Sequence, residues 1–223
     1  MATQSRPDIA YATCYASSAY ADGTIGDLKL VNRTIKFLKA NPLKIRFPTM
    51  IAKTHLFLFF SDASFGNLHD AKSQGGHIVF AVDPSGNCCP LTWQNKKIKR
   101  VCKSTLASES WAMVEAIESA ELVIKQHCEL FKSTSTNMIC ITDCKSLYDV
   151  IHTTNTLEDK GLCIPLACLR QRVTQEEMSV RWVSTTYQLA DCLTNAGASV
   201  SRLREVLATG KFEHEILDIV FEN

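Results

Sequence analysis

Four acidic residues stand where apolar segments end. Asp62 follows the apolar run LFLFF, and Asp143 follows MICIT. Glu109 lies early in a predicted helix, three residues after Leu106, so it faces inward with the apolar stripe. Asp191 begins the last predicted helix. If the first two runs are neighbouring strands, their carboxyl ends form one edge of a sheet, which is where ligands bind in sheets of this kind.

Carboxylates crowded into a half-buried site raise one another's pKa, and a divalent cation relieves that repulsion. Oxygen ligands without supporting cysteine or histidine favour Mg²⁺ or Mn²⁺. Two such ions, about 3.5–4 Å apart, activate a water and stabilise the leaving oxygen of a displacement at phosphorus. The pattern therefore predicts a two-metal site. Singly, each acid has a plainer interpretation as a strand-end cap, a turn former or, for Asp191, a partner of the helix dipole.

The elements that must position these acids have an α/β pattern. Three predicted strands occupy residues 55–64 and 75–98, where a Pro-Ser-Gly-Asn turn indicates a hairpin. The later predicted elements are a helix over 104–131 and a strand over 137–143. Two helices follow, from Ser146 and from Ile164, and then a strand over 178–184 and a helix from Leu189. This order predicts a mixed five-stranded sheet, three antiparallel strands followed by βαβα, with helices on both faces.

The first fifty residues differ from the rest of the chain. Apolar residues recur at helical spacing from Leu28 to Leu38, with Asp27 as the expected N-cap and Pro42 closing the segment. We predict a helical segment over 1–50, a main domain over 51–200 and a C-terminal helix or tail over 201–223.

Composition sets bounds on function. The chain has 223 residues, a net charge of +1 and ten cysteines. A near-neutral chain has no global field that recruits nucleic acid, so such binding requires a local patch. The N-terminus has no signal-like apolar stretch and no C-x-x-C occurs, so we expect free thiols in the cytoplasm or nucleus and no structural zinc. No apolar run is long enough to span a bilayer, and no membrane partner is expected.

The motifs SDASFGN, STLASE, ITDCKSLYD and VRWVSTTYQLADCLT resemble, in order, those of the type 1 ribonuclease H domain of copia-type LTR retrotransposon reverse transcriptases. The lead-in WQNKKIKRVCKSTLASE and the N-terminal RPDIAYATCYASS resemble the same polyprotein. The resemblance implies a ribonuclease H-like fold and two Mg²⁺ or Mn²⁺ ions. It also implies hydrolysis of the RNA strand of an RNA–DNA hybrid, and other parts of a Pol polyprotein as partners. The metal ligands and catalytic residues that it implies are Asp62, Glu109, Asp143 and Asp191.

Substrate contacts are expected around this site. The cluster Lys96, Lys97, Lys99, Arg100 and Lys103 has no acid within it, and it predicts either a phosphate-tracking strip or a solvated edge strand. Backbone N–H groups at Ser64 and in the turn Gln74-Gly75-Gly76 are candidates for approaching a phosphate, although glycine can also serve only the turn. The substrate-binding residues that we predict are Ser64, Gly76, Lys99, Arg100, Lys103 and Cys144.

The sequence departs from the family pattern at several positions. Cys144 stands where the family usually has serine, Ser184 where proline is common, and Asn195 where lysine is usual. The loop before Asp191 has no histidine, and the chain has no Asp-Asp pair, so it is not a complete reverse transcriptase. The three tryptophans, Trp93, Trp111 and Trp182, are expected to be core or sheet-packing residues rather than base-stacking platforms. Two functions remain open: an active hybrid nuclease, or an inactive relic or domesticated hybrid-binding or structural module.

Overall fold

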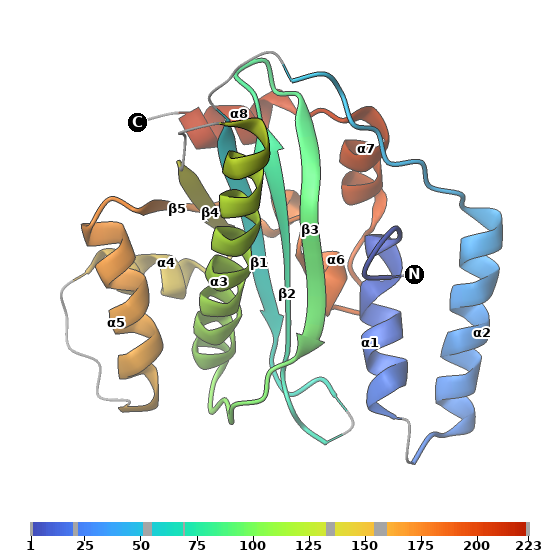
Figure 1. Cartoon of the computed structure of the whole chain (residues 1–223). Helices are drawn as coiled ribbons and strands as arrows, with labels where there is room; N and C mark the ends of the chain where they lie inside the picture. Colours follow the sequence, from blue (N-terminus) through green and yellow to red (C-terminus); the bar gives the residue numbers. More distant parts are fainter. Residues whose placement is uncertain are drawn as a thin grey trace.

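The fold is known from a computed structural model that describes residues 2–19, 22–50, 55–68, 70–132, 137–153 and 160–221. A sheet forms the centre of the molecule, and the chain begins and ends with helices packed around it (Figure 1). The strands are β1 (Leu56–Ser64), β2 (Gln74–Val82), β3 (Cys88–Lys97), β4 (Met138–Thr142) and β5 (Met178–Trp182). The helices are η1 (Pro7–Ile9), α1 (Ala10–Ser18), α2 (Ile25–Ala40), α3 (Thr105–Phe131), α4 (Lys145–His152), α5 (Lys160–Thr174), η2 (Thr185–Tyr187), α6 (Asp191–Thr194), α7 (Ser201–Thr209) and α8 (His214–Phe221).

The five strands are ordered β3-β2-β1-β4-β5. The pairs β1–β2 and β2–β3 are antiparallel, whereas β1–β4 and β4–β5 are parallel. Antiparallel neighbours need only short turns, while each parallel connection carries helices across the sheet. The predicted fold class is therefore confirmed: the protein has a mixed five-stranded α/β sheet with helices on both faces.

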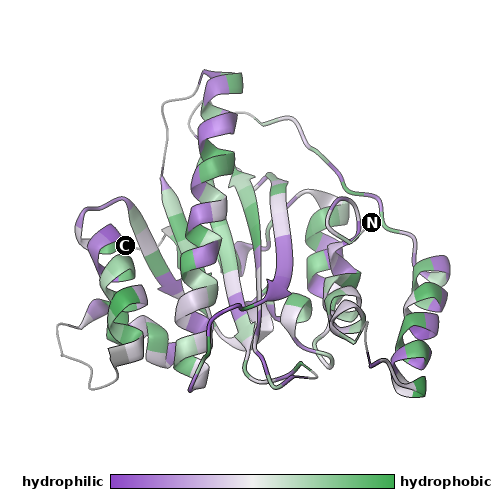
Figure 2. Ribbon diagram, turned by 60° about the horizontal axis from the view of Figure 1, so that its bottom comes forward, coloured by the Kyte–Doolittle hydropathy of each residue, from purple (hydrophilic) through white to green (hydrophobic). Residues whose placement is uncertain are grey.

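Both faces of β1 are buried, because its residues alternate between two apolar cores. Leu58 and Phe60 pack into the core built with α6, α7 and α8. Phe57 and Phe59 face the opposite way, into the core built with α3, α4 and α5. A central strand covered on both sides is expected to be apolar throughout, as LFLFF is. Figure 2 shows this apolar centre between more polar helix surfaces.

Helix α3 crosses the front of the sheet in Figure 1. Its N-terminus is fixed by Ser104, whose hydroxyl accepts a hydrogen bond from the Ala107 N–H at 3.2 Å. Met113, Ile117 and other apolar residues at helical spacing are buried against β1 and β2. This packing sets the rotation of the helix, and with it the direction of Glu109.

The N-terminal helices lie beside the β3 edge of the sheet (Figure 1). Helix α2 begins at a capping box in which Thr24 is the N-cap and Asp27 occupies the third helical position. The expectation that Asp27 is itself the N-cap is wrong, because a threonine hydroxyl three residues earlier takes that position. The segment also contacts the main sheet, since the Trp93 Nε1–H donates to the carbonyl of Ala2 at 2.7 Å.

A buried ion-pair cluster ties the two ends of the chain together. The Asp8 carboxylate accepts from Arg6 at 2.8 Å and also pairs with Arg204 of α7. Arg204 donates in addition to the carbonyl of Pro42 at 2.9 Å. The predicted division after residues 50 and 200 stays a prediction, and residues 51–54 at the first boundary lie outside the described residues.

The turn predicted at Gln74-Gly75-Gly76 is wrong, because these residues form the start of β2. Gly76 is buried opposite Asp62 in the antiparallel register, directly beneath α6. A Cβ at Gly76 would lie 2.8 Å from Thr194 Cγ2 and 3.0 Å from Leu193 Cβ. The missing side chain lets α6 approach the sheet.

In the part of the chain that the structure describes, no helix combines the length and the apolarity needed to cross a bilayer. All ten cysteines are free thiols.

Replacing Gly76 by alanine is expected to push α6 away from β2 and to lower the free energy of unfolding by about 1–3 kcal/mol, the usual cost of overpacking. Gly197→Ala is the matched control, because a Cβ there meets nothing within 4 Å, and it is expected to change stability by less than about 0.5 kcal/mol. Urea denaturation of both variants measures the difference. Equal stability of the two would contradict the close approach of α6.

Candidate active site

The four predicted acids come from four different elements that meet at one end of the sheet. Asp62 lies near the end of β1, and Asp143 follows β4 directly. In the parallel register Phe60 is level with Ile141, so continuing the same count places Asp62 level with Asp143. Glu109 is in the second turn of α3, and Asp191 is the first residue of α6. The two strands are therefore neighbours, which is the condition on which the expected meeting of Asp62 and Asp143 depended.

Two of these acids are almost completely buried. The exposed fraction is 4% for Asp62 and 5% for Glu109. The Glu109 atom Oε2 is buried and has no hydrogen-bond partner. Buried carboxylate oxygens without partners are costly, so an unpartnered one at a shared edge indicates a place for a ligand.

Burial and mutual repulsion raise the pKa of three of the acids. Burial is the main cause for Asp62, whose pKa rises to about 7, with the charges of Asp143 and Asp191 adding to the effect. The pKa of Glu109 is raised well above its usual value by burial and then by Asp62. Burial and Asp143 also raise the pKa of Asp191. The four acids are thus close enough to act on one another electrostatically.

Two polar residues at the end of α6 hold the carboxylates. The Thr194 hydroxyl donates to Asp62 Oδ2, which opposes the rise of that pKa. Asn195 Nδ2 donates to Asp191 Oδ1 and, at 3.5 Å, to Asp62 Oδ2. Asn195 was visible in the sequence as a departure from the family pattern, but Thr194 was missed. Its only signal is a hydroxyl three residues after an acid on a short helix.

Gln188 is a second residue that the sequence analysis missed. Its buried side-chain amide donates to the carbonyl of Ser61 at 3.0 Å and to that of Ile141 at 3.5 Å. Its Oε1 accepts from the Ala190 N–H at 3.2 Å. One side chain therefore joins β1, β4 and the loop that leads to Asp191, and no local sequence pattern indicates this because all three segments are distant in the chain.

Trp182 is a third. Of the two expected places, the core is wrong for Trp182, because 41% of the residue is exposed; it is the last residue of β5 in the sheet. Its indole Nε1–H donates to the backbone carbonyl of Asp143 at 3.0 Å. The ring therefore lies at the rim of the acid cluster, since β5 ends there beside β4. Trp93 and Trp111 are partly buried.

The predicted substrate-binding residues surround this end of the sheet at different depths. Ser64 ends β1, and Cys144 is the N-cap of α4, with its Sγ 3.3 Å from Ser146 Oγ. The three cations Lys99, Arg100 and Lys103 are exposed in the loop before α3. Gly76 is the exception, because it is buried in β2.

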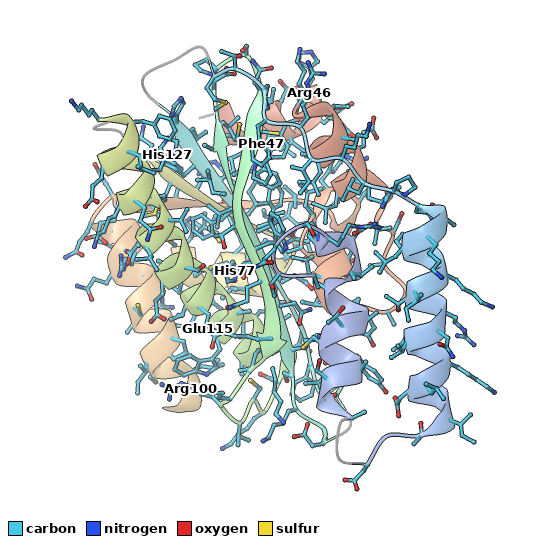
Figure 3. The ribbon with its side chains drawn as sticks, turned by 45° about the vertical axis from the view of Figure 1, so that its right-hand side comes forward. Arg46, Phe47, His77, Arg100, Glu115 and His127 are labelled. Carbon is cyan, nitrogen blue, oxygen red and sulfur yellow. The ribbon has the colours of Figure 1, made fainter. Side chains whose placement is uncertain are left out.

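Two observations describe the lysine-rich stretch more closely. The Arg100 guanidinium lies 4.1 Å from the Trp111 ring centroid, and Figure 3 shows it at the start of α3. Lys96 and Lys97 are partly neutralised, because they pair with Glu115 at 3.3 Å and Asp70 at 2.6 Å.

The donor set fits a hard divalent cation. All four acids offer oxygen, and Glu109 Oε2 is a buried acceptor with nothing to accept from. Among the described residues, however, no three His, Cys, Asp or Glu side chains are grouped closely enough to hold an ion as they stand. Hydrogen bonds from Thr194 and Asn195 instead engage Asp62 and Asp191.

No protein-family model matches the chain, and no curated protein matches its sequence. Its fold is similar to solved ribonuclease H domains, including a retroviral one. The N-terminal RNase H domain of Rv2228c from Mycobacterium tuberculosis is 17% identical with a TM-score of 0.48, covering 64% of this chain and 92% of that one.

Two further solved structures have lower TM-scores than this domain. LC11-RNase H1, solved in complex with an RNA/DNA hybrid, is 13% identical with a TM-score of 0.45. The match covers 62% of this chain and 94% of that one. The RNase H domain of prototype foamy virus is 11% identical with a TM-score of 0.38. The match covers 71% of this chain and 95% of that one. Similarity at these levels assigns no activity to the chain.

Proposed function

We propose that the protein is a metal-dependent endonuclease that hydrolyses the RNA strand of RNA–DNA hybrids. The observation that carries the proposal is the meeting of Asp62, Glu109, Asp143 and Asp191 at one edge of the sheet, with a buried, unpartnered Glu109 oxygen among them. Such a cluster is costly to fold unless positive charge compensates it. The four ordered motifs that resemble copia-type ribonuclease H domains support the choice of substrate and a retrotransposon polyprotein as the origin.

Asp62, Glu109 and Asp143 would hold the cations, and Asp191 would complete the set. Mg²⁺ or Mn²⁺, when bound, supplies an activated water and a counter-charge for the leaving oxygen. Thr194 and Asn195 orient Asp62 and Asp191 through their hydrogen bonds. Gln188 holds the ends of β1 and β4 at a fixed separation. The exposed cations Lys99, Arg100 and Lys103 are placed to contact phosphates without reading the base sequence.

An inactive hybrid-binding or structural module is the second candidate. Two observations favour it: no group of three potential ligands has converged in the described residues, and Asp62 and Asp191 are engaged with neighbouring side chains. The thiol of Cys144 is also a weaker hydrogen-bond donor than the serine usual in the family.

Cleavage of a labelled RNA–DNA hybrid distinguishes the two candidates. With Mg²⁺ or Mn²⁺ we expect only the RNA strand to be cut, with no cutting in EDTA and none of an RNA–RNA duplex. Asp62→Asn and Asp143→Asn are each expected to lower the rate by roughly 100-fold or more, because each removes a carboxylate that would hold the cations.

Asp149→Asn is the control for cleavage, since Asp149 is exposed and paired only with Lys145 on the surface of α4. It is expected to cut like the unmodified protein. A folded chain that binds the hybrid and leaves the RNA intact would favour the binding module, and Cys144→Ser would then test whether the thiol is responsible.

The raised pKa of Asp62 makes stability depend on pH and on metal. In EDTA, the folded state holds the Asp62 proton up to pH 7, whereas the unfolded chain releases it near pH 4, so stability is expected to fall as pH rises between these values. The slope is on the order of 1 kcal/mol per pH unit. Mg²⁺ at pH 8 is expected to restore part of the loss, because a cation compensates the ionised carboxylates.

Urea denaturation at several pH values, with and without Mg²⁺, measures this linkage. Asp62→Asn is expected to be more stable than the unmodified protein at pH 8, with a flatter pH dependence and a smaller response to Mg²⁺. Asp149→Asn should keep the original dependence. Identical pH slopes for the Asp62 and Asp149 variants would show that Asp62 is not held in its protonated form.

A further inference from the structure

Positive charge is concentrated in one stretch of an otherwise balanced chain. Residues 28–61 contain seven lysines and arginines and no aspartate or glutamate, while the whole chain has a net charge of only +1. The rest of the molecule is therefore net acidic. Such a local asymmetry produces a positive field over one surface even when the total charge is near zero.

Most of these cations project from one side of α2. At 100° per residue, Lys29, Arg33, Lys36 and Lys39 fall within one arc of about 120°. All four are exposed. In the part of the chain that the structure describes, none of the four makes an ion pair. We call this surface the basic face of α2. It differs from the lysine-rich end of β3, where Lys96 and Lys97 are paired with acids.

Residues of α2 outside the basic arc fix the direction of the basic face. Phe37 is partly buried, with the guanidinium groups of Arg6 and Arg204 at 6.0 Å and 5.6 Å from its ring centroid. The only acid in the helix, Asp27, is buried in the capping box with Thr24. The helix therefore turns its cations outward, and Figure 3 shows long nitrogen-tipped side chains pointing from it away from the rest of the molecule.

A groove beside the basic face reaches Asn195, the residue that follows α6. A cavity of about 260 Å³ is lined by Arg33 and Thr34 of α2, by Tyr11 of α1 and by Asn195 after α6. Asn195 is the residue that donates to Asp191 and Asp62. The nearest cation of the basic face thus shares a groove with a residue that holds two of the four carboxylates.

We propose that the basic face of α2 binds the phosphate backbone of a nucleic-acid duplex, beside the acid cluster and independently of it. Lys29 to Lys39 extend over roughly 15 Å along the helix axis, a length over which a duplex presents on the order of nine phosphate charges. Contacts of this kind position a duplex without reading its sequence. The choice of an RNA–DNA hybrid as the ligand rests on the proposed function.

An anionic membrane surface would also attract lysines, but the position of the face, near Asn195 and the acid cluster, favours a duplex. Membrane-surface helices pair a basic side with a broad apolar side that inserts among lipids. Here the largest apolar residue of α2, Phe37, faces the protein. The exposed apolar residues Ile25, Leu28 and Ile35 do not form one broad side, because Asn32 and Lys39 separate Ile25 from the other two around the helix. The groove shared with Asn195 also continues toward the proposed catalytic end.

Fluorescence anisotropy with a labelled RNA–DNA hybrid in EDTA tests the proposal without any cleavage. The test variant carries Lys29→Gln, Lys36→Gln and Lys39→Gln. The control carries Lys125→Gln, Lys132→Gln and Lys211→Gln, which are exposed and remove the same charge. Lys125 and Lys132 lie toward the C-terminal end of α3, and Lys211 pairs with Asn87 between β2 and β3. Both variants should keep the thermal stability of the unmodified protein, because all six side chains are exposed.

The α2 variant is expected to bind the hybrid roughly 10- to 100-fold more weakly at about 100 mM salt, with the slope of log K against log salt smaller by about 2.7, corresponding to three lost phosphate contacts. The control is expected to bind within a factor of about two of the unmodified protein, because it removes no contact. Equal losses in both variants would show a general effect of net charge, and no loss in either would exclude contact at α2. Either result overturns the proposal.

A second experiment measures the binding of the same proteins to vesicles that contain phosphatidylserine. Loss of vesicle binding in the α2 variant, with hybrid binding unchanged, would identify a membrane surface and also overturn the proposal. Because binding is measured without metal, a chain that binds through α2 but never cuts RNA would support this inference while contradicting the proposed nuclease.

Discussion

The parallel pairing of β1 with β4 is the constraint on which the site depends. It brings the ends of two buried strands to one edge, so that Asp62 and Asp143 share a single electrostatic environment. Burial and like charge raise the pKa of Asp62 to about 7, which means that the fold tolerates an unfavourable arrangement at this edge. Strain of this kind is common at functional sites, where stability is lost to obtain a reactive geometry.

The rest of the structure keeps that edge in place. Two apolar cores hold β1 from both sides, and Gln188 links the carbonyls of Ser61 and Ile141 just before the two acids. The absence of a side chain at Gly76 lets α6 approach closely enough for Thr194 to reach Asp62. These contacts come from three separate parts of the chain, so the geometry of the acids is a property of the assembled fold.

Charge is distributed unevenly along the chain, although the net charge is only +1. The acids cluster at the end of the sheet, whereas the N-terminal helices contribute an uncompensated basic surface beside it. The buried pair of Asp8 and Arg204 joins these helices to α7, which fixes the basic surface relative to the acids. A cationic surface next to a carboxylate cluster is physically consistent with the polyanionic ligand and the metal-binding role that we propose.

The α/β class, the order of the strands along the chain and the acid candidates could be predicted from the residues alone, because apolar periodicity and strand-end acids are local signals. The sequence also placed Glu109 on the inward face of its helix. Only the tertiary structure decided that Gly76 lies within a buried strand, that Trp182 is exposed at the rim, and that Thr194 and Gln188 hold the acids. These features depend on contacts between residues as many as 132 positions apart, and no local pattern encodes such contacts.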